Sequence, residues 1–186
     1  QVTVDGVSHR IPEPFCVFAT QNPTGASGTQ LLPDSQMDRF TVRLSIGYPA
    51  PADEREILLS RQKGNPLLQV RQVVTREELL SMQQEAANVY VKPELADYIV
   101  SLVGKTRQDP MIARGASPRA TLSLGAMAKS VAYVQGRDYV LPKDIQAVFV
   151  STCAHRLLLS AEADAKGMRA EELLESILKS TPAPRI

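Results

Sequence analysis

The 186-residue sequence contains no tryptophan, only two cysteines (Cys16 and Cys153) and only two histidines (His9 and His155). Two cysteines are too few for a disulfide-stapled scaffold or a cysteine zinc site, and they fit a reducing cytoplasm. Two histidines are also too few for a histidine-rich metal centre. The chain has no G-x-S-x-G pattern and no Cys–His pair at a spacing typical of nucleophilic catalysis. We therefore expect no catalytic site that is complete within these residues.

Excess charge and long apolar runs are also missing. The chain has 21 Lys and Arg against 20 Asp and Glu, and this net charge of +1 argues against a nucleic-acid partner bound through a basic surface. No apolar run approaches the roughly 18 residues of a membrane span, and the first residues lack the basic and apolar regions of a signal peptide. With 44% hydrophobic residues the chain is too apolar to be disordered. These features predict a folded, cytoplasmic protein with no membrane partner.

Composition divides the chain near residue 50. Residues 1–52 hold seven of the 41 charged side chains, and the segment GYPAP at 47–51 can continue neither a strand nor a helix easily. The first residue is Gln1 rather than Met, within a predicted strand, so we expect a fragment of a longer protein. We predict one domain over 1–50 and a second over 51–186.

The first half reads as strands and loops. Apolar residues alternate around Asp5-Gly6, the strongest short signal for a β-hairpin. The apolar run at 15–19 and the alternating segment at 41–46 predict two covered strands, with a short helical turn at 34–39 between them. Two covered strands cannot build a parallel α/β domain without neighbours, which is a second indication of a fragment.

The second half reads as a helical bundle. Acidic residues after Asp53, a capping box at 75–78, and prolines or polar caps before apolar stripes of helical period predict successive helices. The predicted starts are Asp53, Thr75, Pro93, Ser117-Pro118, Pro142 and a last helix that contains Ala170. Gly104-Lys105-Thr106 resembles the tail of a phosphate-binding loop, but Ile99 replaces the required glycine, so we interpret it as a helix C-terminus. His155 is predicted to be a partly exposed surface residue.

Three polar residues are candidates for chemistry. Asn22 follows a predicted buried strand, where ligands of α/β sheets gather, although Asn-Pro also starts ordinary turns. Arg39 precedes the second strand and could face a phosphate or form a surface ion pair with Asp38 or another acid. Arg119 lies in the first turn of a helix, where a cation opposes the helix dipole unless it meets an anion. Local physics thus favours a function for Arg119 alone.

Taken together, several segments resemble the MoxR-type AAA+ ATPases. The matching segments are FCVFATQNP (15–23), LPDSQMDRF (32–40), GYP (47–49), GASPRA (115–120), GRDYVLPKDI (136–145) and AHRL (154–157). The resemblance implies an α/β plus all-α fold, in which a partial AAA+ core with a hairpin and two strands precedes a helical lid. The strands at 15–19 and 41–46 would be separated by a missing strand, so we expect them to be poorly ordered, rearranged or paired with another chain.

The same resemblance implies roles for single residues. Asn22 would be sensor 1, which polarises the attacking water, and Arg39 the arginine finger, which reaches the nucleotide of a neighbouring subunit. Arg119 would be sensor 2, acting in cis or in trans, with Ser117 and Pro118 beside it in the ATP site. The stretch after Asn-Pro, at 24–28, departs from the family's acid-containing pattern.

The resemblance further implies a ring, as a hexamer, that binds ATP and Mg²⁺ and remodels or activates client proteins. Such proteins often work beside von Willebrand factor A domain proteins, including in metal-cofactor insertion. The Walker A loop and Walker B acids are expected upstream, so we predict that this segment alone is inactive. The alternative is a non-enzymatic helical interaction module that reuses the lid scaffold.

Overall fold

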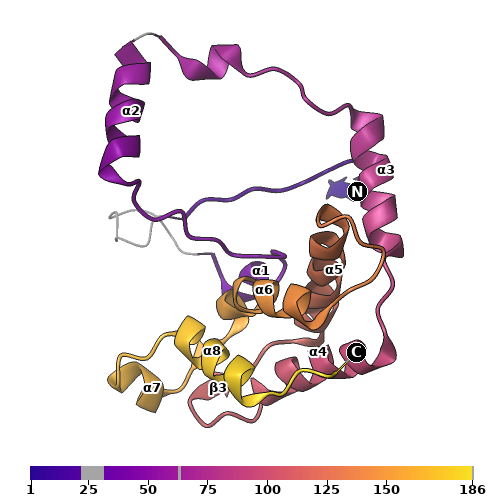
Figure 1. Cartoon of the computed structure of the whole chain (residues 1–186), viewed down its shortest axis with the longest axis vertical. Helices are drawn as coiled ribbons and strands as arrows, with labels where there is room; N and C mark the ends of the chain where they lie inside the picture. Colours follow the sequence, from indigo (N-terminus) through magenta and orange to yellow (C-terminus); the bar gives the residue numbers. More distant parts are fainter. Residues whose placement is uncertain (22–31, 63, 186) are drawn as a thin grey trace. The chain divides into compact units, whose positions relative to one another are not determined.

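The computed structural model describes residues 1–21, 32–62 and 64–185 (Figure 1). The chain forms two compact units, one of Gln1–Pro14 with Leu44–Ser81 and one of Phe15–Arg43 with Met82–Ile186. Asn22 lies outside the described residues. The domain division at residue 50 stays a prediction.

The first unit begins with the predicted hairpin. Strands β1 (Val2–Val4) and β2 (Val7–His9) pair antiparallel, with Val4 opposite Val7. Asp5 and Gly6 have φ values of 50° and 79°. Positive φ at both central residues is what a type I′ turn requires, and Asp-Gly tolerates it. The hairpin prediction is confirmed.

The rest of the first unit is helical and has no buried core among its described residues. It contains α2 (Pro51–Gln62), the 3₁₀ turn η1 (Pro66–Gln69) and the start of α3 (Arg76–Asn88). The capping box forms as predicted, because the Glu78 carboxylate accepts from the Thr75 backbone N–H at 2.7 Å and the Thr75 hydroxyl oxygen accepts from the Glu78 N–H at 3.2 Å.

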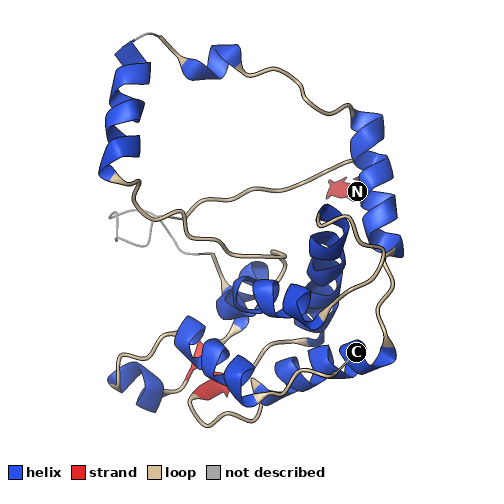
Figure 2. Ribbon diagram, in the orientation of Figure 1, coloured by secondary structure: helices blue, strands red, loops and turns tan. Residues whose placement is uncertain are grey.

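The second unit packs its helices around one apolar core (Figure 2). Helix α5 (Pro118–Val134) contacts α4 (Pro93–Lys105) and α6 (Pro142–Cys153), and α6 contacts α8 (Ala170–Ser180). The largest fully buried apolar side chains are Phe149, Leu95, Leu102, Leu124, Ile145 and Leu174. These helices begin close to the predicted residues, because proline at the first position of α4, α5 and α6 suits a helix start.

Short elements complete this unit. They are α1 (Asp34–Met37), β3 (Ile112–Arg114), the 3₁₀ turn η2 (Ala154–Arg156), β4 (Leu158–Leu159) and α7 (Ala161–Ala165). Strands β3 and β4 pair antiparallel, which the sequence analysis did not predict. Pieces this short carry too few residues for a period to be recognised.

The two covered strands predicted at 15–19 and 41–46 do not form, and that part of the prediction is wrong. Their side chains stay open to solvent, with Phe18 90% and Ile46 100% exposed. A strand covered on both faces needs neighbouring strands, and the described residues supply none beside these segments. This outcome agrees with the expectation that the two segments are rearranged when the strand between them is missing.

The ion pair at the start of α6 leads to a prediction on pH. Asp144 is 2% exposed and receives two hydrogen bonds from the Arg137 guanidinium, at 2.6 and 2.7 Å, and one from the Leu141 N–H at 2.7 Å. Burial raises the pKa of the Asp144 carboxyl, but these hydrogen bonds and the Arg137 charge outweigh it and leave that pKa lowered. A carboxyl with a lowered folded pKa stabilises the fold above its unfolded pKa, near 4, and loses this effect as pH falls further.

We therefore expect Asp144→Asn to lower the free energy of unfolding by about 1.5–3 kcal/mol at pH 7. The difference between wild type and variant should shrink as pH falls below about 4. Urea titrations followed by circular dichroism at several pH values measure this. A difference that stays constant down to about pH 2 would contradict the assigned role of Asp144.

Candidate functional site

The predicted site residues of the second unit meet at the ends of two helices. Asp38 follows α1 directly and Arg39 comes next in the chain, while Ser117 precedes α5 and Pro118 and Arg119 form its first turn. Both helix ends lie in the same compact unit, so contacts between their side chains are defined.

The Asp38 carboxylate joins them. It accepts a hydrogen bond from the Ser117 hydroxyl at 2.9 Å and one from Arg119 Nη1 at 3.1 Å. Arg156 Nε lies 3.2 Å from the same carboxylate. Asp38 is 26% exposed and Arg119 is 52% exposed, so the Asp38–Arg119 pair is open to water and weakly held.

Arg156 is the buried part of this cluster, with no exposed side-chain surface. Its guanidinium donates to the carbonyl oxygens of Asp38 (3.1 Å), Phe40 (2.7 Å) and Thr152 (2.6 Å), and to the Ser123 hydroxyl (3.1 Å). Burial lowers the pKa of the Arg156 guanidinium and the Asp38 carboxylate opposes this, yet an arginine stays charged in proteins. The contacts tie residues 38–40 to α5 and α6.

His155 reinforces the same attachment, and its prediction as a surface residue is wrong. It is 8% exposed, and its Nε2 lies 2.9 Å from the Phe40 carbonyl oxygen. Helix α6 ends at Cys153, and η2 then turns His155 inward, so the helical period extrapolated past this end misplaced it. Burial lowers the pKa of His155, which favours a neutral ring whose Nε2–H donates to Phe40.

Cys153 is a core residue rather than a nucleophile. It is fully buried, and burial raises the pKa of its thiol to about 12, although the Arg156 charge opposes this. A thiol in this state is not a nucleophile near neutral pH. Cys153 therefore contributes packing at the end of α6.

Arg39 lies between Asp38 and Phe40, whose carbonyl oxygens both accept hydrogen bonds from Arg156. Its side chain is exposed and makes no hydrogen bond or ion pair with another described residue. The ion pair between Arg39 and Asp38 that the sequence allowed is not formed, because the Asp38 carboxylate pairs with Arg119 and Arg156 instead. Among the described residues nothing competes for the Arg39 guanidinium, whose planar fork of donors suits an anion.

The loop before α5 is fixed by a close approach to the end of α4. The Thr106 hydroxyl donates to the Val103 carbonyl at 2.6 Å and accepts from the Ala116 N–H at 3.0 Å. A Cβ on Gly115 would lie 2.6 Å from the Thr106 carbonyl oxygen, so only glycine fits. Gly104-Lys105-Thr106 thus ends α4, as predicted, and supports the loop that carries Ser117 and Arg119.

We expect Gly115→Ala to lower the free energy of unfolding by about 1–3 kcal/mol, because the added methyl meets rigid backbone. Gly104→Ala is the matched control, since a methyl added there would have no atom within 4 Å and alanine favours a helix. Urea unfolding of both variants measures the contrast. Equal stabilities would show that the loop can move away at no cost.

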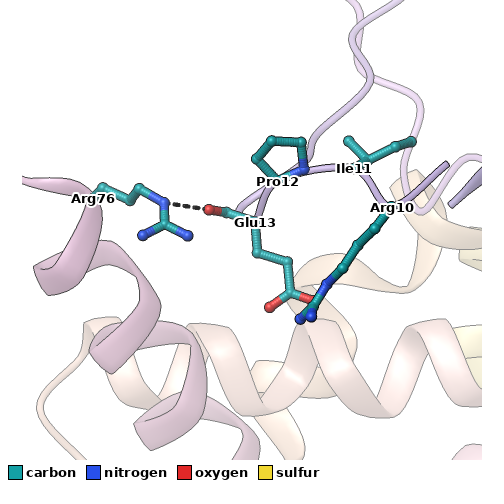
Figure 3. A pocket seen from close by; sticks show the side chains of 5 residues that line it. All are labelled: Arg10, Ile11, Pro12, Glu13 and Arg76. Atoms are coloured by element: carbon teal, nitrogen blue, oxygen red, sulfur yellow. Dashed lines mark hydrogen bonds between the residues drawn. The ribbon is translucent and has the colours of Figure 1, made fainter.

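A separate pocket lies within the first unit (Figure 3). Arg10, Ile11, Pro12, Glu13 and Arg76 line this space of about 250 Å³, and Arg76 Nε donates to the Glu13 carbonyl oxygen. None of the predicted site residues lines it. It therefore contributes nothing to the candidate site.

The donors in the Asp38 cluster (Asp38, Ser117, Arg119 and Arg156), and Arg39 beside it, suit a phosphate better than a metal. Arg39, Arg119 and the Ser117 hydroxyl can all donate to phosphate oxygens, and the start of α5 favours an anion. Within the described ranges no group of three His, Cys, Asp or Glu side chains could hold a metal ion. In the same residues, no helix is both long and apolar enough to cross a bilayer.

Comparison with known proteins supports one family. Residues 104–177 match a family described as the AAA lid domain, and residues 1–42 match the ATPase family associated with various cellular activities (AAA). The protein Chaperone MoxR1 of Mycobacterium tuberculosis is 38% identical over 194 residues, covering all of this chain and 51% of that protein. These matches support a segment of a MoxR-type AAA+ ATPase.

Two further relatives match nearly the whole chain. YeaC of Bacillus subtilis is 38% identical over 183 residues, covering 98% of this chain and 57% of that protein. The crystal structure of a proposed ATPase from Cytophaga hutchinsonii is 33% identical and has a TM-score of 0.91, covering 99% of this chain and 58% of that one. The chain thus spans about half the length of the curated relatives that it matches.

Sequence reasoning missed Asp38, Gly115 and Arg156 as parts of the site. Arg156 lay within a segment that resembled the family, but helical periodicity says nothing about a side chain beyond the end of its helix. A buried arginine beside an irregular segment could have been inferred only from the tertiary contacts that surround it.

Proposed function

We propose that the protein containing this chain hydrolyses ATP with Mg²⁺ and couples hydrolysis to the remodelling or activation of client proteins. Similarity to MoxR-type AAA+ ATPases supports nucleotide binding, and one relative carries the name Chaperone MoxR1. The observation that carries the proposal is the Asp38 cluster, which connects the Arg39 segment with the Arg119 helix start.

Each site residue has a role in this proposal. Asn22 orients the attacking water, Arg39 reaches the nucleotide of a neighbouring subunit, and Arg119 contacts phosphate, with Ser117 and Pro118 beside it. Catalysis of phosphoryl transfer depends mainly on positioned positive charge, which the two arginines would supply. Their exposure supports this use, because a buried and fully paired arginine could not turn to a ligand.

The proposal also covers assembly and surroundings. Residues 1–50 belong to the ATPase core and 51–186 to the lid, and this segment is inactive without the Walker A and B elements. The complete protein forms a ring, a hexamer, in the cytoplasm. A von Willebrand factor A domain protein is the proposed partner class, and metal-cofactor insertion the proposed use.

Turnover of ATP by the complete protein tests the proposal. We expect Mg²⁺-dependent hydrolysis, and a decrease of kcat by roughly 10- to 100-fold in Arg119→Ala, because one donor to the transition state is lost. Arg169→Ala is the control, since Arg169 is 70% exposed and pairs with Glu172 at the start of its own helix. No hydrolysis by the complete protein, or equal loss in both variants, would refute the proposed role of Arg119.

A further inference from the structure

The backbone around Arg39 is held from both sides by one guanidinium group. Arg156 Nη2 donates to the carbonyl oxygens of Asp38 at 3.1 Å and Phe40 at 2.7 Å, which are the residues before and after Arg39. Residues 38–42 have no regular secondary structure, so these carbonyls have no ladder or helix partner. Arg156 supplies a partner on each side of one exposed side chain, and His155 Nε2 also lies 2.9 Å from the Phe40 carbonyl.

The same guanidinium group of Arg156 also bonds to two helices of the lid. Its Nη1 donates to the Thr152 carbonyl at 2.6 Å, on α6, and its Nη2 also reaches the Ser123 hydroxyl at 3.1 Å, on α5. The Arg43 N–H donates to the Ser151 carbonyl at 2.9 Å, which holds the segment again a few residues further on. The segment around Arg39 therefore rests on the second turn of α5 and the C-terminal end of α6.

Burying a cation in a protein core is energetically unfavourable. Removing a guanidinium from water costs free energy that an apolar side chain of similar size would not require. This unfavourable free energy has a reason if the guanidinium fixes an irregular backbone segment. Its planar fork of donors sets both the direction and the length of the hydrogen bonds. The residue that benefits is the one between the two bonded carbonyls, whose own side chain stays exposed.

We propose that Arg156 is the positioning residue for Arg39, holding its backbone so that the Arg39 guanidinium is presented at a constant place to a nucleotide phosphate. The inference rests on the proposed function, since it assigns Arg39 to the nucleotide. A preorganised donor needs no rearrangement when charge develops, and a loosened one loses that advantage. Arg156 also makes this presentation depend on the lid, because its own anchors lie on α5 and α6.

The test is a double-mutant cycle in the complete protein with Mg²⁺ and ATP. We expect Arg156→Gln to lower kcat about 10- to 100-fold with the KM for ATP changed less than about threefold. In the Arg39→Ala background, Arg156→Gln should lower kcat by no more than about twofold further, because residues that act as a unit are not additive. Arg156→Lys should rescue little, since lysine lacks the fork.

Two more variants keep the test decisive. Arg137→Gln removes the other well-buried arginine pair of this unit, with Asp144, and any effect on kcat should multiply with that of Arg39→Ala. If Arg156→Gln does not fold, Ser123→Ala loosens the same guanidinium more gently, and a loss of a few fold should again disappear in the Arg39→Ala background.

The outcomes separate the two proposals. If Arg39→Ala slows turnover but the Arg156 or Ser123 effects multiply with it, or are absent, the positioning role is wrong while the proposed function stands. If Arg39→Ala leaves turnover unchanged, the arginine finger and the positioning role both fail. If Arg156→Gln lowers kcat in the otherwise wild-type protein but not in the Arg39→Ala background, the inference is supported.

Discussion

Arg39→Ala in the complete protein should lower kcat for ATP about a thousandfold or more, with a smaller change in KM. An arginine that meets the developing charge on the transferred phosphoryl group contributes about 10³–10⁵ in rate. The exposed Arg39 side chain has no competing partner among the described residues, so its loss should remove the proposed phosphate contact without unfolding the unit. Steady-state kinetics of ATP hydrolysis measures the effect.

The matched control is Arg43→Ala, four residues further along the same segment. Arg43 is 46% exposed and pairs with Glu171, which is 40% exposed, and such surface pairs contribute little. We expect a change in kcat of less than about twofold. Arg39→Lys should not restore the rate, because lysine presents a point charge rather than a planar fork. Equal behaviour of the Arg39 and Arg43 variants would contradict the arginine-finger assignment.

Phe149→Ala has the largest expected effect on stability. Phe149 is the largest side chain of the core with no exposed surface, and it lies in α6, which packs against both α5 and α8. Removing the ring loses its burial and leaves a cavity, at a cost of about 3–5 kcal/mol. Urea unfolding of the 186-residue chain, followed by helical circular dichroism, measures the change.

Leu122→Ala is the comparison for Phe149→Ala. Leu122 is 76% exposed on α5, so its truncation should change the free energy of unfolding by less than about 0.5 kcal/mol. A loss for Phe149→Ala below about 1 kcal/mol would mean that α6 does not form the centre of the core as described.

Local signals in the sequence predicted the helices well and the two covered strands poorly. Pro93, Pro118 and Pro142 begin helices, and the Thr75 capping box forms, because a helix satisfies its backbone within its own residues. The Asp5-Gly6 hairpin is equally local. A covered strand instead needs partners that are distant in sequence, and the apolar run at 15–19 cannot specify them.

The candidate site shows the same distinction at the level of single residues. The sequence by itself identified Arg39 and Arg119 as charges that need an explanation, because their types and their places before or at the start of an element are visible in the chain. It also determined the Gly104 helix end and the family resemblance. Only the tertiary structure decided that Asp38 pairs with Arg119 and that Arg156 is buried against the carbonyls beside Arg39. These contacts join positions about 80 and 118 residues apart, and no local preference encodes which distant side chain will satisfy an irregular backbone.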